Sequence, residues 1–154
     1  MIRRRHALTL MELIIGMMIL AITATVAIVN INAIKSQTAK REAEKLAQWL
    51  TTRMTIADSR NEAFTLSTSA STAVIEWASS KSTSVKQDKL EASTGCTFTL
   101  ASPLKYSVEN NNFTQGGHIK VKAHNNATDT DEYYFVIIAT IGGRVRTADK
   151  APSS

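Results

Sequence analysis

The sequence predicts an α+β protein in which one long N-terminal α-helix, with a transmembrane half and an amphipathic half, packs on a C-terminal antiparallel β-sheet domain. Three observations support this fold class. Residues 8–34 are almost continuously apolar, a helical stripe of apolar residues follows as far as residue 60, and beyond Asn61 apolar residues alternate with polar ones. The length of 154 residues suits a single globular domain.

The N-terminal region combines a basic start with a long apolar run. Three arginines occupy positions 3–5, residues 13–29 contain neither charge nor proline, and apolar character continues to Ile34. This run is long enough for a transmembrane helix, which needs about 20 predominantly apolar residues. The arginines predict that the amino terminus lies inside and that everything after residue 35 lies outside.

Glu12 is the one carboxylate near the start of this run. A charge inside a membrane span costs about 2.5–3.5 kcal/mol even on lenient insertion scales, so a plain anchor has no use for it. We therefore expect Glu12 to meet a positive group on a neighbouring copy of the same segment.

Residues 35–60 change to an amphipathic pattern. Apolar residues recur at steps of three and four, and charged residues such as Lys40 and Glu44 occupy the other faces. No proline interrupts residues 8–60, so one helix of about 50 residues is allowed. The predicted buried stripe consists of Ala39, Ala43, Leu46, Leu50, Met54 and Ala57.

From Asn61 the period becomes two, which predicts short β-strands separated by loops rich in Ser, Thr, Asn and Gly. We expect six to eight strands in one antiparallel sheet. The single cysteine, Cys96, lies in one of these alternating runs and excludes an intrachain disulfide, so we expect a buried structural thiol. The apolar residues that mark the strands are Phe64, Leu66, Val74, Ile75, Trp77, Cys96, Phe98, Leu100, Ile119, Val121 and the run 133–138.

The string Ala7-Leu8-Thr9-Leu10-Met11-Glu12, set between basic residues and an apolar helix, resembles the prepilin signature of type IV pilins and type II secretion pseudopilins. Ala7 stands where that family usually has Gly, and Leu8 where it usually has Phe. The resemblance implies that a prepilin peptidase cuts between Ala7 and Leu8 and methylates the new amino terminus. Glu12, then the fifth residue, would neutralise the amino terminus of an adjacent subunit in a fibre.

Two further segments are similar to the GspH/FimT group of minor pseudopilins: residues 46–66, and the closing stretch 141–146 with its glycine–arginine sequence. The resemblance implies a minor pseudopilin or pilin-like subunit of a type II secretion system or type IV pilus, assembled into a periplasm-spanning fibre. It implies a single-pass protein of the bacterial inner membrane with a periplasmic globular domain. Its partners would be other pseudopilins through the N-terminal helix, the prepilin peptidase and the inner-membrane assembly platform.

The expected organisation follows from these assignments. Residues 1–7 form the leader, 8–34 the transmembrane or fibre-core half of the helix, and 35–60 its amphipathic half. Residues 61–147 form the β-rich domain and residues 148–154 a flexible tail.

The sequence contains no constellation typical of an enzyme, and we expect neither catalysis nor a cofactor. No phosphate-binding loop or nucleophile elbow is present, and the three histidines, His6, His118 and His124, are dispersed. An acidic cluster in a predicted loop is a weak calcium candidate, because Ca²⁺ prefers oxygen ligands. The cluster consists of Asp129, Asp131 and Glu132.

The charge leaves one alternative function open. The formal charge is +5, and removal of the three leader arginines from 18 basic residues leaves 15 against 13 acidic ones, or +2. Arg144 and Arg146 alternate on one face of the last predicted strand, a pattern that can contact phosphates. The alternative is therefore a FimT-like minor pilin that binds DNA during uptake, with Lys120, Lys122 and Lys150 beside the arginines.

Overall fold

The computed structural model describes residues 10–78, 86–125, 129–140 and 143–152. The chain divides into two compact units, Met1–Lys35 and Ser36–Ser154. A single helix, α1 (Leu10–Arg60), contributes residues to both units. Every described residue of the hydrophobic core belongs to the second unit. Residues 36–154 therefore have the core that a domain needs to fold on its own.

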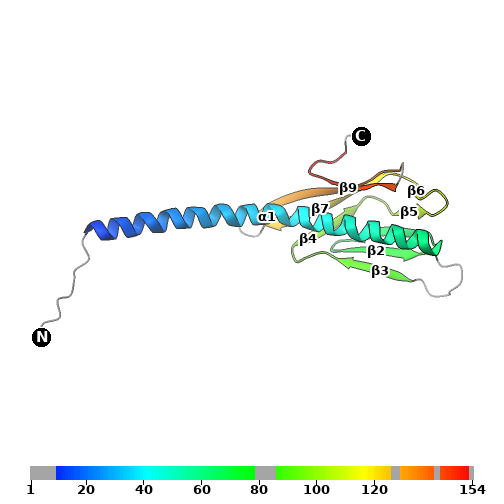
Figure 1. The fold of residues 1–154 in the computed structure, drawn as a ribbon, viewed down its shortest axis with the longest axis horizontal. Coiled ribbons are helices and arrows are strands. Elements are labelled where there is room, and N and C mark those ends of the chain that lie inside the picture. The colour runs from blue at the N-terminus through cyan, green and yellow to red at the C-terminus, as the bar shows by residue number, and fades with distance from the viewer. Residues whose placement is uncertain (1–9, 79–85, 126–128, 141–142, 153–154) are drawn as a thin grey trace, which may run out of the picture. The chain divides into compact units, whose positions relative to one another are not determined.

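The described part of the second unit contains nine strands in two antiparallel sheets (Figure 1). The five-stranded sheet has the order β3-β2-β1-β5-β6, and the four-stranded sheet has the order β4-β7-β8-β9. The strands are β1 (Phe64–Ser69), β2 (Thr72–Trp77), β3 (Gln87–Glu91), β4 (Cys96–Leu100), β5 (Leu104–Ser107), β6 (Asn112–Phe113), β7 (Gly117–Asn125), β8 (Thr130–Ile138) and β9 (Val145–Ala148).

The helix ends at Arg60 because Asn61 adopts the left-handed conformation, with φ 54°. The Glu62 N–H then donates back to the Ala57 carbonyl at 3.0 Å, which satisfies one of the carbonyls left open at a helix C-terminus. Asn tolerates this conformation better than most residues, so the sequence provides a stop between helix and sheet.

The core lies between the second part of α1 and the inner faces of both sheets. Of the predicted helical stripe, every residue except Met54 is buried, and Met54 packs against the same core. Phe64 is the centre of an aromatic cluster: its ring stacks on Tyr106 with centroids 4.9 Å apart and meets Trp77 and Phe113 edge-on. Cys96 is buried as expected.

The fold class predicted from the sequence is wrong as stated. The β-rich unit is chiefly antiparallel β, with its nine described strands divided between two sheets where one sheet was expected. Only the residues of α1 from Ser36 onward belong to that unit, and the described chain has no transmembrane half. Alternation of apolar residues marks where strands occur, but it does not encode which strands pair. The sequence pattern therefore could not predict the division into two sheets.

The predicted single-pass location in the inner membrane also needs correction. In the part of the chain that the structure describes, no helix is both long enough and apolar enough to cross a membrane. Such a span needs about 20 apolar residues. At the start of α1, the described apolar side chains run only from Met11 to Ile22. The side chains described from Thr38 onward include the charged Lys40 and Arg41.

Three described strands, β3, β5 and β6, have no counterpart in the predicted set, and all three depend on pairing with other strands. β3 is largely polar, and it is held by pairing with β2 and by Asp88. The Asp88 Oδ2 atom accepts a hydrogen bond from Trp77 Nε1 at 3.1 Å and lies 3.1 Å from Arg53 Nε on α1. β5 pairs with β1 through Tyr106 opposite Phe64, a contact across 42 residues of sequence.

Candidate functional surfaces

The first surface is the start of α1, residues 11–23, which we call the apolar segment. Its large apolar side chains are between 45% and 71% exposed. They lie on all sides of the helix, whereas a helix on a protein surface normally has one apolar stripe. Glu12 lies in the first turn, where the positive end of the helix dipole favours a carboxylate. The exposed residues are Met11, Leu13, Ile14, Ile15, Met17, Met18, Ile19, Leu20 and Ile22.

The predicted processing residues, Ala7 and Leu8, lie outside the described residues. Of the predicted processing and assembly residues, Ala7, Leu8 and Glu12, only Glu12 lies within the described part of the chain.

The second surface is the outward-facing side of the four-stranded sheet, which we call the outer face. Directly opposed residues in an antiparallel sheet share a face, and residues two apart on one strand share it too. Lys120 pairs with Phe135, Lys122 with Tyr133, and Ile137 with Arg146. These side chains therefore share the face opposite the core, where Arg146 from β9 joins the two lysines of β7. Arg144 is exposed just before β9.

Aromatic rings lie among the cations of the outer face. Lys120 Nζ lies 4.0 Å from the centroid of the Tyr133 ring, within the range of a cation–π contact. His118 meets the Phe135 ring edge-on, with centroids 5.8 Å apart. The register separates Tyr133 and Phe135, which lie on the outer face, from Tyr134, which packs against the core.

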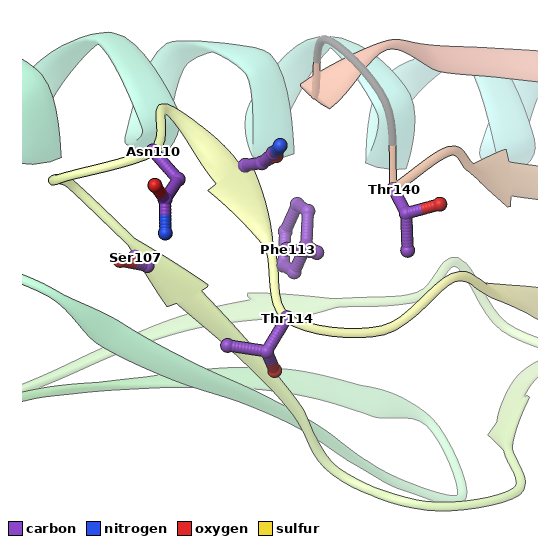
Figure 2. Close-up of a pocket in the computed structure, with 6 residues that line it drawn as sticks. Ser107, Asn110, Phe113, Thr114 and Thr140 are labelled. Carbon is purple, nitrogen blue, oxygen red and sulfur yellow. The ribbon is translucent and has the colours of Figure 1, made fainter.

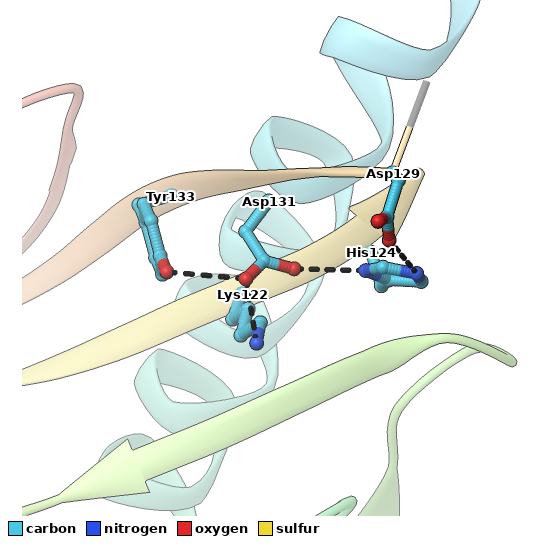
Figure 3. A network of polar contacts seen from close by, with 5 residues as sticks. All are labelled: Lys122, His124, Asp129, Asp131 and Tyr133. Carbon is cyan, nitrogen blue, oxygen red and sulfur yellow. Dashed lines mark hydrogen bonds and ion pairs between the residues drawn. The ribbon is translucent and has the colours of Figure 1, made fainter. Parts of the chain in front are cut away.

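One end of the outer face carries a polar network around Asp131 (Figure 3). Lys122 Nζ lies 2.8 Å from Asp131 Oδ2, and His124 Nδ1 lies 2.9 Å from Asp131 Oδ1. The hydrogen bond from Lys122, followed by that from His124, lowers the pKa of Asp131 below its ordinary value. The same hydrogen bond raises the pKa of Lys122. Tyr133 Oη donates a longer hydrogen bond, 3.4 Å, to the same carboxylate.

The three carboxylates considered for calcium do not converge. Asp131 faces outward and is occupied by Lys122 and His124, and Asp129 lies 3.7 Å from His124 Nε2. Glu132 is the next residue on β8 and points to the opposite face of the sheet. Among the residues that the structure describes, no group of three or more His, Cys, Asp or Glu side chains is placed to hold a metal ion.

Sequence reasoning missed a buried carboxylate on α1. Glu42 is buried, and its carboxylate accepts hydrogen bonds from Ser93 Oγ at 2.6 Å and from the Ser93 N–H at 3.3 Å. Lys45 Nζ lies 3.5 Å away on the next turn. Burial, with Glu42 nearby, raises the pKa of Cys96. Glu42 lies outside the predicted apolar stripe, and Ser93, which covers it, is 51 residues further along the chain, so the helical pattern did not indicate its burial.

Two further contacts between distant segments, at Gly143 and at Tyr106, were also not predicted from the sequence. Gly143 has φ +56°, and a Cβ atom there would lie 2.7 Å from the Asn111 carbonyl oxygen and 3.0 Å from Met54 Cε. Tyr106 Oη donates to Asp58 Oδ1 at 2.8 Å; its burial, followed by that bond, raises the pKa of Tyr106. The glycine-rich stretch was one signal available in the sequence for the first of these.

Comparison with known proteins adds no relative: no family model, no curated protein and no solved structure matches the chain. The two surfaces and the resemblance carried by residues 7–12 are therefore the features that bear on function.

Proposed function

We propose that the protein is a minor pilin-like subunit that assembles through its N-terminal helix into the fibre of a type II secretion system or a type IV pilus. The observation that carries the proposal is the apolar segment, whose large side chains are exposed around the whole helix. Full burial of one such side chain contributes about 1.5–3 kcal/mol, so the segment gains most when other helices cover it. Copies of the same segment in a fibre core would provide that cover.

Glu12 gives this assembly a register. A carboxylate that enters an apolar helix bundle needs a cation, because an uncompensated charge is costly away from water. The prepilin resemblance supplies that cation as the free amino terminus of a neighbouring subunit, created by cleavage between Ala7 and Leu8. A wrong axial offset would leave both charges uncompensated.

Replacement of Glu12 tests the proposal directly. Glu12→Ala and Glu12→Lys should leave the 36–154 unit folded but remove the protein from sheared or overproduced fibres, measured by immunoblotting of the fibre fraction. Glu44→Ala is a matched control, because Glu44 is an exposed carboxylate on the same helix, 4.0 Å from Lys40. Incorporation of both Glu12 variants at the wild-type level would contradict the register role.

Cleavage can be tested separately. Co-expression with a prepilin peptidase should give a mature chain that begins at Leu8, seen by mass spectrometry of the amino terminus. Ala7→Leu should leave the leader attached, because the resemblance requires a small residue at that position. An Ala7→Leu chain that is still cut at this bond would show that another signal directs processing.

The outer face favours a second candidate function, binding of DNA during uptake. Lys120, Arg144 and Arg146 place cations on or beside this face, and Tyr133 and Phe135 add rings on which bases can stack. Lys122 contributes less, because Asp131 neutralises it at 2.8 Å.

Residues 36–154 should then bind fluorescently labelled DNA with an affinity that falls as salt rises. A plot of the logarithm of the binding constant against the logarithm of the salt concentration should have a slope of about −0.9 for each phosphate contact. Arg146→Ala and Lys120→Ala should weaken binding and reduce that slope, whereas Lys89→Ala, an exposed lysine on β3, should not. Asp131→Asn should strengthen binding by releasing Lys122. Absence of binding at low salt would remove this candidate and leave the fibre proposal standing.

A further inference from the structure

The four-stranded sheet has two edge strands, β4 and β9, and the described chain covers the edge of β4. There the Phe98 N–H donates to the Ala70 carbonyl at 2.6 Å, and the Leu100 N–H donates to Thr68 Oγ1 at 3.0 Å. The end of β1 and the turn after it therefore accept hydrogen bonds that β4 directs away from β7. An edge strand without such cover can pair with another chain.

β9 forms the opposite edge of this sheet, and its pairing with β8 shows which backbone groups stay free. The Ala139 N–H donates to the Arg144 carbonyl at 3.0 Å. Because the direction of backbone groups alternates along a strand, Arg146 also faces β8, whereas Val145 and Thr147 direct their N–H and carbonyl groups away from it. Within the described ranges, these groups of Val145 and Thr147 have no backbone partner. We call this outward side of Val145 and Thr147 the free edge.

The side chains beside the free edge differ between the two faces of the sheet. Arg146 is exposed on the outer face, and Arg144 is exposed just before the strand. On the other face, the half-buried Val145 packs against the core, and a Cβ atom on Gly143 would lie 3.0 Å from Met54 Cε. In the part of the chain that the structure describes, neither arginine has an ion-pair partner. The free edge is therefore cationic on one face and apolar on the other.

The β5–β6 hairpin limits the free edge at its beginning. The Asn111 carbonyl oxygen in this hairpin would lie 2.7 Å from a Cβ atom on Gly143. Phe113 of the same hairpin and Thr140, which follows β8, line one hollow beside it (Figure 2). A strand added to β9 would therefore begin to pair at Val145 and would span the four residues of β9.

We propose that the free edge binds an extended peptide segment of a partner protein, in which acidic and apolar residues alternate, as an additional strand of the sheet. The backbone of the segment would hydrogen-bond with Val145 and Thr147, as peptides do when they extend a sheet at its edge. An acidic side chain opposite Arg146 would lie on the outer face, and opposite charges across a strand pair are favourable. The apolar side chains of the segment would contact Val145 and Met54. This binding does not depend on the proposed assembly function, because the free edge belongs to the 36–154 unit alone.

The test is a nuclear magnetic resonance titration of isotope-labelled residues 36–154, which contain the whole described core, with three capped pentapeptides. The first alternates glutamate with valine, the second alternates lysine with valine, and the third is the first with N-methylated valines. The first should shift the amides of residues 145–148 in a saturable way. The others should each bind at least about tenfold more weakly, the factor that corresponds to one lost hydrogen bond.

Two results would overturn the proposal: no saturable shift with the acidic peptide, or equal binding of its N-methylated form. Double-stranded DNA is titrated in parallel. DNA that shifts these amides when the acidic peptide does not would assign the arginines to the second candidate function alone.

Two variants separate the backbone contribution from the charge contribution. Thr147→Pro removes an outward N–H and keeps the N–H groups that Arg146 and Ala148 direct toward β8, a position where edge strands accept proline. This variant should weaken the acidic peptide by about tenfold. Arg146→Glu should reverse the order of the acidic and basic peptides, which tests the charge whether or not the proline variant folds. Lys89→Glu, a charge reversal at an exposed lysine of β3, is the matched control and should keep the order. An Arg146→Glu domain that still prefers the acidic peptide would contradict the proposed pairing.

Discussion

The two parts of α1 illustrate how one continuous helix can serve two purposes. In the part from Thr38 to Arg60, apolar residues form a single stripe, and Leu46 and Leu50 are completely buried against the sheets. In the apolar segment the large side chains are exposed, and Leu20 remains 69% accessible. The apolar segment therefore leaves its described side chains uncovered, whereas the part from Thr38 to Arg60 buries its apolar stripe against the core of the domain. The difference predicts that substitutions will divide into those that affect assembly and those that affect folding.

The largest expected difference is between the unfolding free energies of the Leu46→Ala and Leu20→Ala variants. Leu46→Ala should reduce the free energy of unfolding by about 2–5 kcal/mol, because it opens a cavity in a closed core. Leu20→Ala should leave that free energy unchanged and weaken self-association. Both tryptophans, Trp49 and Trp77, lie in the 36–154 unit, so urea unfolding followed by their fluorescence reports on this unit alone. An equal loss of stability in the two variants would erase the distinction between the two parts.

Two glycines give the next comparison. Gly143→Ala should cost about 2–3 kcal/mol, since the added Cβ meets the Asn111 carbonyl and the left-handed backbone disfavours it. Gly16→Ala should leave the domain's unfolding midpoint unchanged, because nothing lies within 4 Å of its added Cβ. Thermal unfolding of the full-length variants, followed by tryptophan fluorescence, measures both effects. A Gly143→Ala chain as stable as wild type would show that this contact relaxes freely.

A smaller effect distinguishes two glutamates on the second part of the helix. Glu42→Ala should cost about 1–2 kcal/mol, because it removes two hydrogen bonds from Ser93 to a charged acceptor. Glu44→Ala removes an exposed carboxylate 4.0 Å from Lys40 and should change stability by less than about 0.5 kcal/mol. The measurement is urea unfolding of residues 36–154. Similar losses for both would mean that the Glu42 contact contributes no more than a surface ion pair.

The smallest effect concerns pH and the exposed network at Asp131. Its folded pKa is lowered, so its stabilisation is present above the unfolded value, about 3.9, and disappears as pH falls through the folded pKa. The raised pKa of Lys122 means that its contribution is lost only as pH rises above about 10.5. The difference in unfolding midpoint between wild type and Asp131→Asn should therefore be present at pH 7 and shrink as pH falls below the unfolded pKa, about 3.9. A difference that stays constant throughout the acid range would assign it to another cause.

The local chemistry of the sequence predicted several of these features. Steps of three and four predicted the buried stripe, because a helical period places those residues on one side whatever they later contact. Alternation predicted the strands around Phe64, Phe98 and Val121 for the same reason. Arg144 and Arg146 are exposed, as charged residues outside a small core usually are, and their contact with phosphates stays a prediction.

Other features required the tertiary structure. The sequence did not predict two sheets, because strand pairing depends on contacts between distant segments, such as Phe64 with Tyr106. Burial of Glu42 depends on Ser93, and the requirement for Gly143 depends on Asn111. The outer face combines three strands, and only their register brings Arg146 onto the face shared by Lys120 and Tyr133.

The sequence by itself determined the apolar character of the start of α1, the place where the helix stops and the positions of most strands. These properties depend on side-chain chemistry and on periods of two and 3.6 residues, which are local. The tertiary structure decided how many sheets form, which charges are buried and which cations share a surface. Those outcomes depend on contacts between residues far apart in the chain, and no local period encodes them.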